Sequence, residues 1–194
     1  MSRRHEGRKA AHGRTLADHD ADALARRAAA GDADAFARLC NGIHHDVWRY
    51  CWSLTRDRHL ADDATQETFL RATTAIAKFR GEAPVRVWFV VLARRSIGHT
   101  IERSRRAPVP ADPVAVPVKD GTGYVDLGAL VTDLPDDARQ AFVLTQMLGF
   151  SYADAAHVMD CAVGTIRSRV FRAKAALVDA WTEEHDITAQ ETGE

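Results

Sequence analysis

Apolar residues recur at helical spacing along most of the chain. The first clear series follows Asp34, a residue type suited to cap the start of a helix. A second helix is predicted over residues 60–79, and Gly81 and Pro84 end it because both residue types interrupt helices. The series after Asp34 places apolar residues at Phe36, Leu39, Cys40, Ile43, Val47 and Leu54.

A third helix is predicted over residues 85–106. Residues 85–92 are rich in Val and aromatic side chains, so β-propensity alone would also allow a strand there. The helical patterns on either side favour a helix. A helix also accommodates the apolar residues of this segment, which are Trp88, Val91, Leu92, Ile97 and Ile101.

A segment rich in Pro and Gly separates this helical part from a second one. It holds Pro108, Pro110, Pro113, Pro117, Gly121 and Gly123, a composition typical of a linker. Residues 130–181 then show three more helical segments, with breaks at Pro135, at Gly149 and over residues 160–162.

The predicted fold class is therefore all-α, with two small helical domains joined by a flexible linker. A chain of 194 residues is long enough for two such domains, each with a modest core. We expect a disordered N-terminal extension over 1–21, a first domain over 22–106, a linker over 107–125, a second domain over 126–184 and a tail over 185–194.

The charges are segregated, although the net charge is only -1. Such separate patches of opposite sign suggest two kinds of partner. Basic residues gather at Arg94, Arg95, Arg103, Arg105 and Arg106, and again at Arg167, Arg169, Arg172 and Lys174. Acidic residues gather at Asp57, Asp62, Asp63 and Glu67, and in the tail after Glu183.

The compartment is predicted to be the cytoplasm. The basic N-terminus is followed by no apolar segment of the kind found in signal peptides, and no run approaches the roughly 20 apolar residues of a membrane helix. Cys40, Cys51 and Cys161 are odd in number and lack C-x-x-C spacing, which argues against a disulfide framework. We expect them to be small buried apolar residues.

Residues 151–177 have the spacing of a helix-turn-helix, with Ser151 as the cap of its first helix. The second helix carries one narrow apolar stripe, formed by Ile166, Val170, Ala173 and Leu177. Phe171 falls outside that stripe among Ser and Arg, where an aromatic ring is able to contact a thymine methyl group. The alternative is a helical hairpin with a solvated basic face.

Residues 148–174 resemble region 4 of the extracytoplasmic-function (ECF) sigma factors, the promoter-specificity subunits of bacterial RNA polymerase. The resemblance is specific because it includes the core Val-Gly-Thr-Ile-Arg-Ser-Arg at residues 163–169, whereas Ala162 stands where the family often has Pro or Ser. It implies that this helix binds the minus-thirty-five promoter element. The DNA-binding residues expected there are Thr165, Arg167, Ser168, Arg169, Phe171 and Arg172.

The helix over residues 60–79 has an apolar side and a polar side, and on the polar side Leu70 is predicted to be exposed. A charged face of this kind is usually just solvated. Residues 62–72, however, resemble the region 2.2 signature of sigma factors, which docks on the clamp of the polymerase's largest subunit. The expected polymerase-binding residues are Asp62, Asp63, Gln66, Glu67, Leu70 and Arg71.

The segment Phe-Arg-Gly-Glu at 79–82, followed by Trp88, resembles regions 2.3 and 2.4, which open the minus-ten element. An unpaired base needs a stacking surface and cations, and Trp88 suits such a surface, although burial in the core is an equally good interpretation. Arg95 and residues 83–85 depart from the family pattern, so the preferred minus-ten sequence is left open. The expected minus-ten residues are Arg80, Trp88, Arg94, Arg95, Arg103, Arg105 and Arg106.

The sequence offers little for enzyme chemistry. Cys40 and His44 lie one helical turn apart but lack a third metal ligand at suitable spacing, and Gly121 and Gly123 lack the flanking strand of a phosphate-binding loop. Asp62 and Asp63 are adjacent and diverge on a helix, which does not suit paired acid/base catalysis. We expect no enzyme activity, no metal, no cofactor and no small-molecule substrate.

The resemblance implies a sigma factor that binds core RNA polymerase and promoter DNA, without membrane insertion, and directs a stress or envelope-response regulon. An anti-sigma partner is a further expectation from the family. Two other classes stay open from the residues. A free-standing helix-turn-helix regulator would bind DNA without polymerase. A helical interaction module would direct no promoter-specific transcription.

Overall fold

The computed structural model describes residues 18–106, 131 and 133–191, with side chains omitted at 105–106 and 183–191. The elements are α1 (Asp18–Ala29), α2 (Ala33–Thr55), α3 (Arg58–Ala75), the 3-10 turn η1 (Ile76–Lys78), α4 (Val85–Arg106), α6 (Asp136–Phe142), the π-helical η2 (Val143–Met147), α7 (Tyr152–Met159) and α8 (Val163–Glu191). No strand occurs in these described ranges, and the all-α prediction is confirmed.

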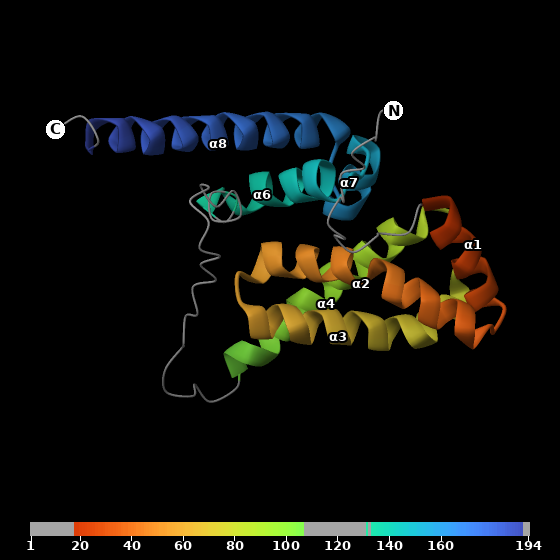
Figure 1. The fold of residues 1–194 in the computed structure, drawn as a ribbon. Helices are drawn as coiled ribbons and strands as arrows, with labels where there is room; N and C mark the ends of the chain where they lie inside the picture. Colours follow the sequence, from red (N-terminus) through yellow and green to blue (C-terminus); the bar gives the residue numbers. More distant parts are fainter. Residues whose placement is uncertain (1–17, 107–130, 132, 192–194) are drawn as a thin grey trace, which may run out of the picture.

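Helices α1 to α4 form an N-terminal bundle in which α2, α3 and α4 pack against one another (Figure 1). Asp32 caps α2 by accepting a hydrogen bond from Ala35 N, and Asp57 caps α3 through Leu60 N. The hydrogen bond from Ala35 N, together with the Arg27 guanidinium, holds the pKa of Asp32 below its usual value. Arg56 ends α2 in the left-handed conformation, so α2 and α3 form a tight hairpin.

Helices α6, α7 and α8 form the C-terminal domain together with η2. Ser151 caps α7 by accepting a hydrogen bond from Asp154 N, as predicted, and Asp160 in the left-handed conformation ends α7. Ile166, Val170 and Ala173 of α8 are buried in the domain core, which confirms most of the predicted stripe, and Leu177 is half-buried. The short turn between α7 and α8 gives the helix-turn-helix geometry.

Several predicted boundaries differ from the structure. Helix α1 begins at Asp18, so the expectation of disorder is wrong for residues 18–21, and residues 1–17 lie outside the described part. The cap of α2 is Asp32 rather than Asp34. Helix α8 continues to Glu191, past the predicted end of the second domain at 184. The predicted linker, 107–125, also lies outside the described residues.

Helix α4 has the predicted bounds but a different core face. Trp88, Val91 and Leu92 are half-buried at the edge of the core. The apolar residues of α4 that are fully buried are Val85, Val87, Phe89, Val90, Ala93 and Ile97. Apolar residues surround much of this helix, so their spacing alone did not identify the side that faces the bundle.

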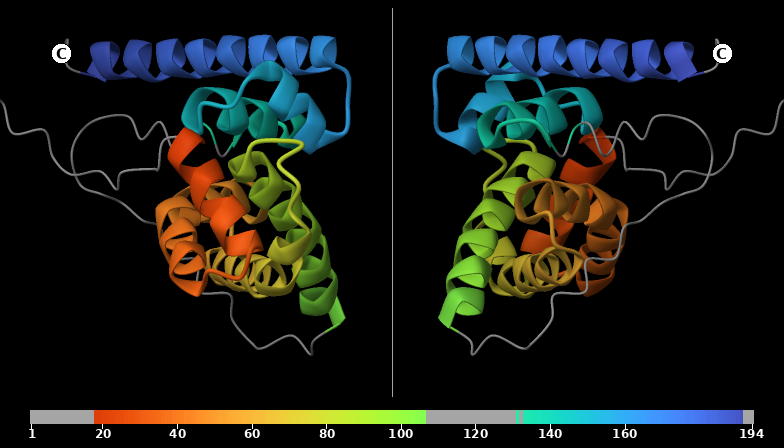
Figure 2. Two further views of the ribbon diagram at one scale, coloured as in Figure 1. Left: turned by 90° about the vertical axis from the view of Figure 1, so that its right-hand side faces the viewer. Right: turned by 90° about the vertical axis from the view of Figure 1, so that its left-hand side faces the viewer.

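The two domains are in contact. Helix α6 packs on α2 and helix α7 packs on α4, with α8 on the far side of α6 (Figures 1 and 2). Within the described residues, no helix is long and apolar enough to cross a membrane. Burial raises the pKa of both Cys40 and Cys51 to about 11, and Cys51 is fully buried, as predicted for a small apolar residue.

Candidate nucleic-acid and partner interfaces

The exposed face of α8 is the first candidate interface. Phe171 is 74% exposed, and Arg167, Ser168 and Arg172 are exposed beside it. The opposite side of the helix is held by Ile166 and its neighbours in the core, so this face is fixed toward solvent. A large exposed aromatic ring between arginines is suited to contact base edges in a major groove.

One predicted residue of α8, Arg169, does not share this face, and a second, Thr165, is only partly exposed. Arg169 is turned toward α6, where its Nη2 donates to Asp137 Oδ2 at 2.7 Å and its Nη1 contacts Cys161 Sγ at 3.5 Å. Its side chain is only 18% exposed. Thr165 is half-buried, and its carbonyl accepts a hydrogen bond from Ser168 Oγ. Arg169 therefore holds α8 against α6 in this structure.

The second candidate interface is a groove between α2 and α3, with a volume of about 530 Å³. Leu70 lies at this groove and is 64% exposed, as the sequence predicted. The ring of His44 stacks on Phe69 with 5.5 Å between the ring centroids. The lining residues are Phe36, His44, Trp48, Asp62, Thr65, Gln66, Phe69, Leu70 and Thr73.

Helix α2 contributes Phe36, His44 and Trp48 to this groove, and the sequence analysis did not assign them to it. Trp48 Nε1 donates to Asp62 Oδ1 at 2.7 Å, which fixes an indole beside the carboxylate. The three positions are separated by eight and four residues, so they share one face of α2. The spacing in the sequence indicated that these three residues share a face of α2. It did not indicate that this face packs beside α3.

The other predicted polymerase-binding residues surround the groove or lie beside it on α3. Gln66 is exposed at the lining. Glu67 and Arg71 form an ion pair one turn apart, with Arg71 Nε 2.6 Å from Glu67 Oε1. Asp63 is exposed and lies 3.7 Å from the Arg103 guanidinium of α4. The result is an apolar groove with a rim of paired charges, a common composition of protein interfaces.

The predicted minus-ten residues differ from one another in exposure and in the contacts that they make. Trp88 is half-buried, and its ring packs edge-on against Phe79 and Phe89, with centroid distances of 5.7 and 5.0 Å. Arg80 and Arg95 are exposed. Arg103 is exposed but is paired with Asp63, and the side chains of Arg105 and Arg106 lie outside the described set.

Arg94 contacts the other domain. Its Nη1 donates to Val158 O of α7 at 2.6 Å. Trp88 is thus partly buried in the core of the N-terminal bundle, and Arg94, although exposed, bonds the helix-turn-helix domain.

Arg86 near the start of α4 is a half-buried charged residue, 12% exposed at its side chain, that the sequence analysis did not single out. It bonds Asp46 Oδ2 at 2.7 Å and Asp18 Oδ1 at 2.8 Å, and its guanidinium lies over the Phe150 ring at 5.1 Å. Burial alone lowers the pKa of Arg86, but the hydrogen bonds and charges of Asp18 and Asp46 outweigh it, so the pKa lies above its usual value. No spacing signal links these partners.

The fold and these surfaces define a two-domain helical protein with a helix-turn-helix in its C-terminal domain and an apolar groove between α2 and α3 of its N-terminal bundle. The family model for sigma-70 region 2 matches residues 39–107, and the model for sigma-70 region 4 matches residues 124–177. The chain is 40% identical to the ECF RNA polymerase sigma factor SigC of Mycobacterium tuberculosis, over 90% of this chain and 98% of the relative. It belongs to the ECF family of RNA polymerase sigma factors.

Solved structures agree on the fold. CnrH, in complex with the cytosolic domain of CnrY, superposes with a TM-score of 0.63 at 22% identity, covering 84% of this chain and 98% of the other. The sigma factor RpoE of Bartonella quintana, in complex with the anti-sigma factor NepR, gives a TM-score of 0.59 at 26% identity, covering 76% and 96%.

Family membership also fixes the activity. The protein is a non-enzymatic initiation factor that works with core RNA polymerase at promoters. The alternative interpretation, a free-standing helix-turn-helix regulator, is not favoured. Groups of three or more side chains able to hold a metal ion are absent from the described residues.

Proposed function

We propose that the two domains divide the work of promoter recognition. The domain over residues 22–106 binds the polymerase clamp through the α2–α3 groove and the melted minus-ten element through α4. The domain over 126–184 binds the duplex minus-thirty-five element through α8. The observation that carries this proposal is the pair of exposed surfaces, the Phe171 face and the Leu70 groove, on different domains.

The arrangement of the helices supports this division. Helices α8 and α3 lie at opposite edges of the molecule in all views, with α6 and α2 between them (Figures 1 and 2). The groove is lined by residues of α2 and α3. Polymerase and upstream DNA therefore have separate surfaces, as a sigma factor requires.

Initiation in vitro tests the function. The purified chain is added to core polymerase with a library of promoters from its own genome, and transcript starts are mapped. We expect starts that core polymerase alone does not give. The absence of such starts would refute the proposal. We place this activity in the cytoplasm, where sigma factors act with the polymerase.

The exposed arginines of α8 are expected to read the upstream element. Arg167→Ala or Arg172→Ala should each weaken binding of that element by about 1–3 kcal/mol, because an arginine bonded to a base edge is lost. Binding is measured with holoenzyme on a promoter that depends on the element. Arg38→Ala, which removes an exposed arginine from α2, is the matched control. A similar loss of core binding would show that the α8 face had been assigned to the wrong partner.

We also propose an anti-sigma partner. The relative from Bartonella quintana was solved as a sigma factor with an anti-sigma factor, and the coverage of both chains is high. Copurification of this chain from its own cells, followed by transcription with and without the captured protein, tests the proposal. An inhibitory protein among those captured is expected, and the absence of any inhibitor would contradict it.

A further inference from the structure

A hydrogen bond between Trp48 and Asp62 joins α2 to α3 at the groove. Trp48 Nε1 donates to Asp62 Oδ1 at 2.7 Å, and both residues line the groove. A bond from an indole N–H to a carboxylate is charge-assisted, so it is stronger than a bond between two neutral groups. The two residues are on different helices, so the bond depends on the packing of α2 against α3.

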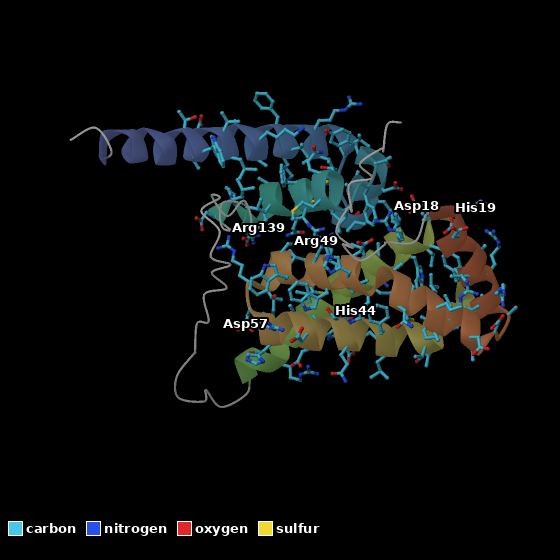
Figure 3. The ribbon with its side chains drawn as sticks, in the orientation of Figure 1. Asp18, His19, His44, Arg49, Asp57 and Arg139 are labelled. Carbon is cyan, nitrogen blue, oxygen red and sulfur yellow. The ribbon has the colours of Figure 1, made fainter. Side chains whose placement is uncertain are left out.

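Aromatic packing along α2 fixes the direction of the Trp48 indole. Its ring stacks on the ring of Trp52, one turn further along the helix, with 5.9 Å between the ring centroids and 6° between the ring planes. Both rings are half-buried and pack against the bundle core. One turn before Trp48, His44 lies between α2 and α3 (Figure 3), where its ring stacks on Phe69. The indole N–H is therefore held in place within the free chain.

The second oxygen of the Asp62 carboxylate is only weakly held. Oδ2 lies 4.0 Å from Arg58 Nε, and the side chains of Arg58 and Asp62 are 73% and 54% exposed. An exposed ion pair at this distance contributes little, because water and salt screen it. Oδ2 is therefore able to exchange Arg58 for a group on a partner protein.

The chemistry of the carboxylate defines that group. An ionised carboxylate only accepts hydrogen bonds, so the group that meets Oδ2 has to be a donor. A cationic side chain is the donor best suited to it, because both members of the pair are then charged. Phe69 and Leu70 provide apolar surface in the same groove. A partner that covers this surface excludes water, which strengthens the attraction between the two charges.

We infer that Trp48 is a positioning residue for polymerase binding. Its indole N–H holds the Asp62 carboxylate at the groove and leaves Oδ2 available for a cationic side chain of the polymerase. This inference rests on the proposed function, which assigns the groove to the polymerase clamp. A carboxylate that is already held in one orientation loses less conformational freedom on binding, so the affinity for polymerase is higher.

A direct contact between the Trp48 ring and polymerase would be a different role. Trp48 lines the groove, so its ring is able to contribute apolar surface there. Such a contact does not depend on the charge of Asp62, whereas positioning acts only through the carboxylate. The two roles are distinguished by replacing Trp48 in the presence and in the absence of that charge.

The test measures the affinity of the labelled full chain for core polymerase by fluorescence anisotropy at several salt concentrations. Trp48→Phe keeps an aromatic ring but removes the N–H donor. Asp62→Asn keeps the shape of the side chain and an oxygen for the indole but removes the charge. A third variant combines the two changes. The control is Trp52→Phe, the same replacement one turn away, at a half-buried ring that does not line the groove.

We expect Trp48→Phe alone to weaken polymerase binding about fivefold, because the carboxylate is no longer held. Asp62→Asn should weaken it at least about tenfold through loss of the charged pair. In the chain that already carries Asp62→Asn, adding Trp48→Phe should change the affinity by less than about twofold. Both single variants should also bind with a weaker dependence on salt, whereas Trp52→Phe should match wild type in affinity and in salt dependence.

An equal loss from Trp48→Phe with and without the Asp62 charge would overturn the positioning role and leave only an apolar contact. Unchanged salt dependence in Asp62→Asn would overturn the cationic partner. Any loss of bundle stability caused by Trp48→Phe is common to both comparisons, so it does not produce the expected difference between them. Failure of the wild-type chain to bind core polymerase, or unchanged binding by Leu70→Asp, would instead refute the proposed function.

Discussion

Leu70→Asp is expected to weaken the binding of core polymerase about a hundredfold. Leu70 is 64% exposed at the edge of the α2–α3 groove, so the substitution leaves the bundle core intact. At the polymerase surface it removes an apolar contact and introduces a charge that would be buried without a partner. Fluorescence anisotropy of the labelled chain, titrated with core polymerase, measures the effect.

Ala37→Asp is the matched control because it adds the same charge at an exposed site of α2 that does not line the groove. Its position near the start of the helix suits an acidic residue. We expect near wild-type binding from this control. If Leu70→Asp also bound as tightly as wild type, the groove would not be the polymerase site.

The sequence predicted those features that depend on local patterns. Ser151 caps α7 because a short polar side chain can reach the free amide groups of the first turn. The exposure of Phe171 and Leu70 followed from their positions opposite the apolar stripes of their helices. The region 2 and region 4 motifs then supplied the family, which the comparisons confirmed.

Features that depend on distant parts of the chain were not predicted. The side chain of Arg169 points to Asp137 on another helix, although its sequence neighbours belong to the exposed face of α8. His44 and Trp48 of α2 line the groove because α2 packs on α3 at these positions. A helical period indicates which residues share a face, but not what that face contacts.

The contacts between the domains were the least predictable. Each pairs an arginine with a backbone carbonyl, and a carbonyl is present in every residue, so no residue type marks the acceptor. Arg94 shows the consequence: its basic neighbours indicated a nucleic-acid surface, whereas in the structure its guanidinium bonds Val158 O.

Arg139→Leu is expected to lower the free energy of unfolding of the C-terminal domain by about 2–4 kcal/mol, because buried acceptors lose a charged donor. Arg139 is 2% exposed and bonds Leu134 O at 2.7 Å and Asp136 Oδ1 at 2.6 Å within its own domain, in addition to Ser53 O across the boundary. Leucine fills part of the volume but leaves the carbonyl groups of Leu134 and Ser53 without this donor.

Urea unfolding followed by circular dichroism measures the change. Arg38→Leu, which alters an exposed arginine of α2, should stay within about 0.5 kcal/mol of wild type. Arg139→Lys should recover part of the loss, since an ammonium is able to reach one carbonyl but not all three partners at once. A loss for Arg139→Leu no larger than that of Arg38→Leu would mean that water replaces the guanidinium without cost.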